Sequence, residues 1–437
     1  MPSTATAGRT SFLPFAYSSA TTGLATNDGI PLFQAFSPIP VQGPTYSDCI
    51  KDGMKIDGAA GTGGMLTVAE ERIREVAEEY GKSVSIHLYG QEVADETYAI
   101  AKSDMLVKGE GGQSNNIFFG STISNDGFAG ETFDFCLSNP PFGTPWKTDL
   151  KAWGDIKKDE ITDPRFRINY HGENFSLIPD IGDPQMLFLA NNISKMKKDT
   201  PMGTRIVEVH NGSSLFTGKA GQGPSNLRQY ILEQDLLEAI VAIPEKMFYN
   251  TGIGTYLWVL ANKKEERRKG KVQLIDATSF KSPLRKNLGE KNCEITPEIR
   301  ERILDLYMAF DKADSRYSKI FDNREFGYWE VTVYTPRIDE NGNPILDNKG
   351  KPIKPDTDKE QIPLTYEGGI EAFIDNEVKP YAPLAYIKPG TEKIGYELSF
   401  TKYFYQPVQL RTLEEITADI RAVENETDGL LDEIIGG

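Results

Sequence analysis

The sequence is poor in the residues that form disulfide frameworks and metal sites. Its 437 residues include only three cysteines and three histidines, all far apart, with no Cys-x-x-Cys pair. That set builds neither a disulfide scaffold nor a zinc site, and the scattered histidines do not predict a metal centre. We therefore expect a cytoplasmic protein that binds no metal. The residues concerned are Cys49, Cys136, Cys293, His87, His171 and His210.

Long apolar runs and an excess of positive charge are also missing. No apolar run approaches the roughly 18 residues that cross a bilayer, and the N-terminus lacks the features of a signal peptide, so no membrane association is expected. The net charge is −16. Proteins that bind DNA alone usually carry a basic surface, because phosphate neutralisation supplies most non-specific affinity. This chain therefore either avoids nucleic acid or reaches it through a partner that supplies positive charge.

What the sequence does contain is an alternation of strand and helix patterns. Short apolar runs alternate with longer segments whose apolar residues recur at helical spacing. This alternation predicts an α/β fold with a mostly parallel sheet and helices on both faces. A short strand is predicted to end at 55–57, the other predicted strands are 83–89, 132–138, 204–210, 237–243 and 254–261, and the predicted helices are 65–80, 92–108, 184–196 and 226–234.

The same patterns divide the chain into four regions. Residues 1–53 are rich in Ser, Thr, Gly and Pro and are predicted to be an irregular N-terminal segment. Residues 54–290 carry the alternation, and within them the polar residues 143–183 are predicted to be a long irregular loop of functional size. Residues 291–410 form a C-terminal region with a helix over 295–311 and a hairpin-like excursion over 336–363. Residues 411–437 are predicted to form an amphipathic helix.

A glycine-rich turn follows the first predicted strand. In an open α/β sheet the backbone approaches a ligand closely at this place, and glycine permits both the tight turn and the contact. No Gly-Lys-Ser/Thr sequence ends the turn, so a triphosphate-binding loop is not predicted. The candidate cofactor-binding residues of this turn are Asp57, Gly58, Ala59, Gly61, Thr62, Gly63 and Gly64.

An acidic residue, Glu92, follows the next predicted strand. An acid at this position can accept hydrogen bonds from both ribose hydroxyls of a nucleoside cofactor. The turn and the acid together favour a nucleoside cofactor, and the alternative is a tight turn followed by a surface glutamate.

The strongest chemical signal is the apolar strand that ends in Asn139-Pro140-Pro141-Phe142. Two prolines cannot continue a central strand, so the chain leaves the sheet at its carboxyl edge, beside the cofactor crevice. An exocyclic amine is a poor nucleophile because its lone pair is conjugated into the ring. The Asn139 amide oxygen and the Pro140 carbonyl can accept both amine hydrogens and favour a pyramidal nitrogen. Phe142 offers a face on which an extruded base can stack. The alternative is a simple strand-terminating turn.

On these motifs the chain resembles the modification (methyltransferase) subunit of type I restriction-modification systems, an N6-adenine-specific amino-methyltransferase family. The resemblance implies a Rossmann-like S-adenosylmethionine-dependent methyltransferase sheet with a C-terminal helical extension. It implies S-adenosyl-L-methionine as the cofactor and adenine N6 in DNA as the methyl acceptor. The matching stretches are 57–66 (DGAAGTGGML), 89–92 (YGQE), 128–143 (FAGETFDFCLSNPPFG), 183–189 (DPQMLFL), 209–218 (VHNGSSLFTG), 235–244 (DLLEAIVAIP) and 248–259 (FYNTGIGTYLWV).

The resemblance also assigns roles to single residues. Asp57, Gly61 and Gly63 would line the methionine part of the cofactor and Glu92 its ribose, while Asn139, Pro140, Pro141 and Phe142 would form the catalytic loop. Phe248 matches a second aromatic that stacks on the flipped base, and a core aromatic is the equal alternative for it.

Two places depart from the family pattern. Relatives carry Asp or Asn where this chain has Ser121, next to the cofactor's adenine, and a serine hydroxyl makes fewer hydrogen bonds. Residues 1–53 also lack the family's helical N-terminal region and its aromatic-Thr-Pro motif.

The resemblance reconciles the acidic charge with DNA as a substrate. In type I systems a separate specificity subunit reads the DNA, so the expected partners are that subunit and a restriction subunit, with two copies of this chain per complex. The C-terminal helix has an apolar stripe that fits a partner helix or its own domain. The alternatives are a cytosine-N4 DNA methyltransferase, a protein-glutamine methyltransferase and a catalytically weak assembly subunit. Asn139 favours adenine over cytosine.

Overall fold

The computed structural model describes residues 52–79, 81, 83–107, 113–141, 143–249, 251–340, 342–405 and 412–423. The predicted N-terminal segment 1–53 lies outside these residues except for its last two, and so does Phe142. The chain divides into two compact units, residues 1–400 and 401–437, which are described separately.

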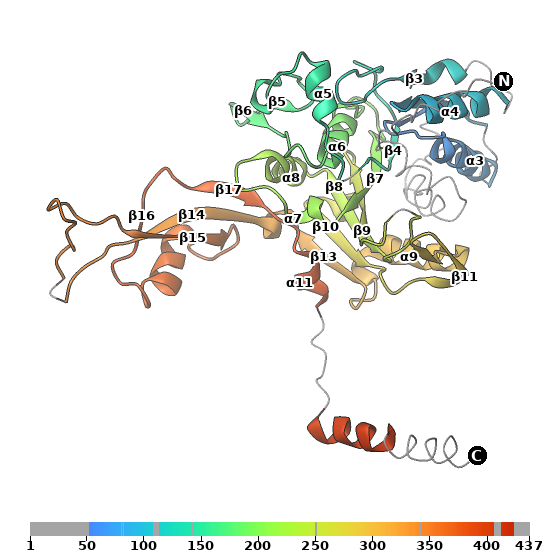
Figure 1. Ribbon diagram of the computed structural model, residues 1–437. Coiled ribbons are helices and arrows are strands. Elements are labelled where there is room, and N and C mark those ends of the chain that lie inside the picture. Colours follow the sequence, from blue (N-terminus) through green and yellow to red (C-terminus); the bar gives the residue numbers. More distant parts are fainter. Residues whose placement is uncertain are drawn as a thin grey trace, which may run out of the picture. The chain divides into compact units, whose positions relative to one another are not determined.

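The first unit is built on a nine-stranded sheet (Figure 1). Its order is β13-β10-β8-β9-β7-β4-β1-β2-β3. Five of its strand pairs are parallel, whereas β9 runs antiparallel to both neighbours and β13 antiparallel to β10. The predicted α/β fold with a mostly parallel sheet is therefore confirmed. The strands are β1 (Asp52–Asp57), β2 (Ser85–Glu92), β3 (Ile117–Phe119), β4 (Phe135–Ser138), β7 (Arg205–Asn211), β8 (Leu237–Ile243), β9 (Thr255–Ala261), β10 (Lys271–Asp276) and β13 (Ser318–Asp322).

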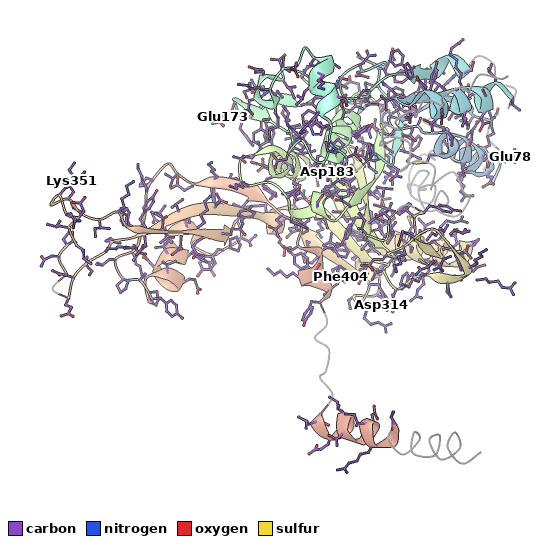
Figure 2. All side chains as sticks on the ribbon, viewed as in Figure 1. Glu78, Glu173, Asp183, Asp314, Lys351 and Phe404 are labelled. Carbon is purple, nitrogen blue, oxygen red and sulfur yellow. The ribbon has the colours of Figure 1, made fainter. Side chains whose placement is uncertain are left out.

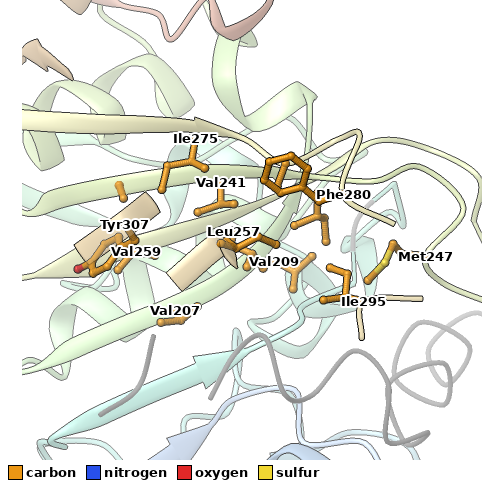
Figure 3. Packing of buried hydrophobic residues seen from close by; sticks show 14 of the residues in the cluster. Val207, Val209, Val241, Met247, Leu257, Val259, Ile275, Phe280, Ile295 and Tyr307 are labelled. Carbon is orange, nitrogen blue, oxygen red and sulfur yellow. The ribbon is translucent and has the colours of Figure 1, made fainter. Parts of the chain in front are cut away.

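Helices cover both faces of this sheet, as the sequence predicts. On one face, Met65 of α3 (Gly64–Glu79) and Tyr307 of α9 (Pro297–Ala309) belong to one buried cluster with the sheet, part of which is drawn in Figure 3. On the other, Asn192 of α6 (Gln185–Ser194) donates a 2.8 Å hydrogen bond to Glu208 of β7. The helix α8 (Gly223–Glu233) contacts α6. Burial on both faces explains why all seven residues of β8 are buried.

Two predicted boundaries at strand ends were wrong, one at the carboxyl edge of the sheet and one at its amino edge. The helix predicted from residue 92 begins later, as α4 (Asp95–Val107), because Gly90, Gln91 and Glu92 pair with β3 and prolong β2. The strand predicted over 132–138 begins only at Phe135. Both errors arise because strand ends depend on the neighbouring strand, which local apolar spacing does not reveal.

The prediction of an irregular loop over residues 143–183 was also wrong. This segment contains α5 (Lys147–Ala152) and an antiparallel hairpin, β5 (Arg167–Tyr170) with β6 (Glu173–Ser176). Trp146 anchors it, since its side chain is fully buried and its Nε1 donates a 3.1 Å hydrogen bond to the Asp180 carbonyl. The anchor is a contact across the length of the segment, so polar composition alone gave no indication of it.

The sheet continues past residue 290 through β13, and further elements follow or flank it. A two-stranded hairpin consists of β11 (Ser282–Leu288) and β12 (Lys291–Glu294). A separate sheet has β14 (Gly327–Thr335) paired with β15 (Asp356–Pro363), β16 (Tyr386–Ile387) and β17 (Lys393–Tyr396), and residues 336–355 connect β14 to β15. Figure 2 labels Lys351 within this connection. The short helices are α7 (Ser213–Phe216), α10 (Gly369–Phe373) and α11 (Phe400–Phe404).

The second unit contains a helix over residues 413–423. Its apolar side chains are exposed, namely Leu413, Ile416, Ile420 and Val423. The other residues of the predicted apolar stripe, Leu430, Leu431 and Ile434, lie outside the described residues. Across the parts of the chain that the structure describes, no helix is long and apolar enough to cross a membrane.

Candidate functional site

The two main motifs leave the sheet side by side at its carboxyl edge. β1 and β4 are parallel neighbours, with Ile56 opposite Cys136, so Asp57 ends one strand and Asn139 directly follows the end of the next. Asn139 is 3% exposed, and the two prolines that follow it are also buried. The sheet order thus brings the predicted cofactor turn next to the predicted catalytic loop.

The glycine-rich turn has the conformation that its sequence predicts. Asp57 accepts a 3.0 Å hydrogen bond from the Ala59 amide, which closes the start of the turn. Gly61 and Gly63 have φ values of 55° and 81°, in the left-handed region that disfavours side chains. A Cβ on Gly58 would lie 3.3 Å from Cγ2 of Thr122, so glycine here lets the loop after β3 approach the turn.

The Glu92 side chain connects this turn to the end of β2 through hydrogen bonds to backbone amides. One carboxylate oxygen accepts hydrogen bonds from the Val93 and Ala94 amides, at 3.0 and 2.8 Å, and the other accepts from the Gly61 amide at 2.8 Å. A carboxylate has about four lone-pair sites. Three are used, so the geometry leaves one acceptor for a ligand hydroxyl rather than the two that the sequence suggested.

A cleft at this edge brings together residues from distant parts of the sequence. Five predicted residues line it, and they come from the turn, the end of β2, the loop after β3 and the catalytic loop. They are Gly58, Ala59, Glu92, Ser121 and Pro141, and Asp149, Pro184 and Phe188 line the cleft with them. Thr62, Gly63 and Gly64 lead from the turn into α3.

Phe248, the predicted second stacking aromatic, lies elsewhere. It is 7% exposed and belongs to the same hydrophobic cluster as Met247 and Ile295. In this structure its ring contributes to the core, as the alternative interpretation of its sequence position proposed.

Asp149 is one of the residues of this cleft that the sequence analysis did not predict, and it is the one that contacts Ser121. It is 3% exposed on α5, and its Oδ1 accepts hydrogen bonds from the Ser121 hydroxyl at 2.5 Å and the Ser124 hydroxyl at 2.7 Å. Ser121 Oγ also accepts from the Ile123 amide at 3.2 Å. Because its proton is directed at Asp149, Ser121 can offer only a lone pair to a ligand. The only sequence signal for Asp149 was its position a few residues after a tryptophan in a polar segment.

The loop that carries Ser121 is fixed by two cations. The Arg165 guanidinium donates 2.7 Å hydrogen bonds to the carbonyls of Thr122 and Ile123. The buried Lys195 ammonium binds Asp126 in the same loop at 2.8 Å. The adenine side of the predicted site is therefore held by groups on the 143–183 segment and at the end of α6.

Of the two cysteines among the residues that the structure describes, Cys136 lies in this part of the sheet. Burial raises the pKa of the Cys136 thiol far above its usual range, and the nearby Glu208 carboxylate raises it further. The thiol on β4 therefore stays protonated at neutral pH and is not a nucleophile.

The comparison with known families identifies the chain. The sequence profile of N-6 DNA Methylase matches residues 34–331. The chain belongs to this family. Within the N-6 DNA methylase family, it is 27% identical over 335 residues to the type I restriction enzyme MjaIX methylase subunit of Methanocaldococcus jannaschii, covering 76% of this chain and 54% of that relative. It is 29% identical over 229 residues to the HindI methylase subunit of Haemophilus influenzae, covering 52% of this chain and 44% of the relative.

This N-6 DNA methylase chain spans about half the length of the curated relatives it matches. Its fold is similar to that of the type I restriction-modification methyltransferase subunit from Streptococcus thermophilus, with a TM-score of 0.53 and 22% identity over 68% of this chain and 55% of that one. The structural likeness supports the fold, and the roles of single residues rest on the geometry above.

Proposed function

We propose that the chain transfers a methyl group from S-adenosyl-L-methionine to adenine N6 in DNA, as the modification subunit of a type I restriction-modification complex. One observation carries the proposal: Pro141 of the Asn-Pro-Pro loop lines the same cleft as Gly58 and Glu92. Methyl transfer requires the cofactor and the target amine to be bound next to each other, because positioning supplies most of the rate enhancement. A cofactor turn and an amine-binding loop at the same edge of the sheet would meet this requirement.

The polar groups that line the cleft support the proposed cofactor, which supplies an electrophilic methyl group on sulfur. The remaining acceptor site of Glu92 would bind one ribose hydroxyl. The lone pair of Ser121, oriented by Asp149, would accept a hydrogen bond from the 6-amino group of the adenine. Asp57, Gly61 and Gly63 would place backbone against the methionine part.

In the proposed reaction the chain's own groups act on the target amine. Asn139 Oδ1 and the Pro140 carbonyl would each accept a hydrogen bond from one N–H of this amine. These two bonds would direct the nitrogen lone pair toward the methyl group. Proline fixes its own φ and restricts the residue before it, so both acceptors are held in place. Phe142 would stack on the extruded base, an assignment that rests on the family resemblance, and Phe248 would need to leave its cluster to do the same.

Restriction protection and methylome sequencing after co-expression with a specificity subunit test this function. N6-methyladenine at one recognition sequence is the expected product. N4-methylcytosine would instead support the alternative amine acceptor. Absence of both, together with no calorimetric binding of S-adenosylhomocysteine by the purified chain, would support the assembly-subunit alternative.

The isolated chain should bind DNA weakly. Its net charge of −16 opposes association with phosphate, so we expect strong sequence-specific binding only when a specificity subunit is added. Gel-shift titrations of the chain with and without that subunit measure this. Tight sequence-specific binding by the chain alone would contradict the proposed division of labour.

The Ser121–Asp149 pair predicts a moderate effect on cofactor affinity. Asp149→Ala removes the acceptor of two buried hydroxyls, so Ser121 is no longer held as an acceptor. We expect the dissociation constant of S-adenosylhomocysteine to rise by about 10-fold, the equivalent of one hydrogen bond of about 1.4 kcal/mol. Calorimetry measures it, with Asp159→Ala on the exposed part of the same segment as the matched control. Equal affinity of both variants would remove Asp149 from the site.

A further inference from the structure

A basic hairpin stands out in this acidic chain. Residues 281–294, the hairpin and the lysine before it, contain four lysines and arginines and two acids, Glu290 and Glu294, whereas the whole chain carries a net charge of −16. Lys281, Arg285 and Lys286 are exposed on β11 or directly before it. Among the residues that the structure describes, none of the three forms an ion pair with an acidic side chain. Their charge is therefore available to a partner.

The hairpin is attached to the loop after β8. The Glu290 amide donates to the Tyr249 carbonyl at 3.0 Å, and the Asn292 amide donates to the Lys246 carbonyl at 3.1 Å. A Cβ at Gly289, whose φ is 63°, would lie only 2.8 Å from the Tyr249 carbonyl oxygen. Glycine at the hairpin turn thus permits the close approach, and the hairpin is held in a defined position against this loop.

The hairpin follows the carboxyl end of β10. This is the edge of the sheet at which the predicted catalytic loop also lies. β10, which precedes the hairpin, is parallel to β8, and both run in the same direction as β7 and β4 because β9 is antiparallel to its two neighbours. In Figure 3, Phe280, Met247 and Ile295 lie at one end of the sheet and Tyr307 at the other. With neighbouring strands about 4.8 Å apart, β10 lies roughly 19 Å from β4, the length of about five to six base pairs at 3.4 Å each.

We propose that Lys281, Arg285 and Lys286 form a contact surface for the phosphate backbone of the DNA substrate, several base pairs from the base that enters the cleft. The inference rests on the proposed function and adds to it the surface through which the chain itself touches DNA. A negative protein repels DNA over most of its surface, so positive charge is most effective where the duplex must lie. Three exposed cationic side chains at nearby positions favour a contact with phosphates over the apolar centre of a protein interface.

The test measures how DNA affinity depends on salt. The complexes of the wild-type chain and of the variant K281Q/R285Q/K286Q with the specificity subunit are titrated by fluorescence anisotropy against a labelled short duplex at several KCl concentrations. Each phosphate contact contributes about 0.9 to the slope of log affinity against log salt, so we expect the variant's slope to be smaller by about 2 to 3. The matched control is K349Q/K351Q/K354Q in the exposed β14–β15 connection, which changes charge equally and should keep the wild-type slope.

Further measurements separate this inference from the proposed function. Both variants should bind S-adenosylhomocysteine like the wild type, which shows that the cleft is intact. If the wild type methylates DNA but has the same salt slope as K281Q/R285Q/K286Q, the hairpin does not contact DNA, and the proposed function is unaffected. Loss of specificity-subunit binding on size exclusion with an unchanged slope would also overturn the hairpin surface, in favour of a protein contact. A wild-type complex that neither binds the cofactor product nor methylates DNA would overturn the function itself.

Discussion

Asn139→Ala is expected to remove methyl transfer while the chain still binds S-adenosylhomocysteine. The side chain follows β4 at the carboxyl edge and is 3% exposed, so an alanine there leaves no substitute acceptor for the target amine. Loss of one preorganised polar group at a reacting centre costs about 10²–10³-fold in rate, and here the group acts on the nucleophile itself, so we expect the upper end of that range or more. The predicted cofactor turn follows β1 and keeps its own contacts, so affinity for the cofactor product should hardly change.

Methylation of a duplex by the complex, followed by mass spectrometry of the nucleosides, measures this loss. Asn139→Asp retains an acceptor oxygen and should keep part of the activity. This variant distinguishes loss of the hydrogen-bond acceptor from loss of side-chain packing. Asn169→Ala on the exposed strand β5 serves as the matched control. Wild-type activity in Asn139→Ala would remove the side chain from the mechanism.

Glu92→Ala should have the second largest effect, on cofactor affinity and stability together. The carboxylate accepts three backbone amides at the turn and at the start of α4. An unsatisfied buried donor costs about 1–3 kcal/mol, so we expect the free energy of unfolding to fall by on the order of 2–3 kcal/mol. Affinity for S-adenosylhomocysteine should fall by roughly 100-fold, because both the ribose acceptor and the fixed position of Gly61 are lost.

Denaturant unfolding and calorimetry measure the two effects of this substitution. Glu92→Gln keeps one acceptor oxygen in a side chain of equal length, so it should lie between alanine and wild type in both measurements. Glu96→Ala, in the exposed first turn of α4, is the control. If Glu92→Ala binds the cofactor product as tightly as the control, Glu92 does not hold the ribose.

Much of the fold was predictable because it depends on local patterns. β8 was predicted with the bounds that the structure shows, since an apolar run buried on both faces has sharp ends. The hairpin within residues 143–183 was missed because its anchor joins Trp146 to a carbonyl 34 residues away. Glu92 was assigned to a helix for the same kind of reason, since its strand pairing is to β3 rather than to its sequence neighbours.

By itself, the sequence determined where the two candidate motifs leave the sheet. Glycines after one apolar strand and two prolines after another dictate where each strand must stop, because these residues restrict or free their own backbone. Only the tertiary structure decided how those residues are used. The sheet order placed β1 beside β4, α5 brought Asp149 to Ser121 from 28 residues away, and three amides took up most of the Glu92 carboxylate. Hydrogen bonds between residues so distant in the chain depend on the folded path, and local composition contains no record of that path.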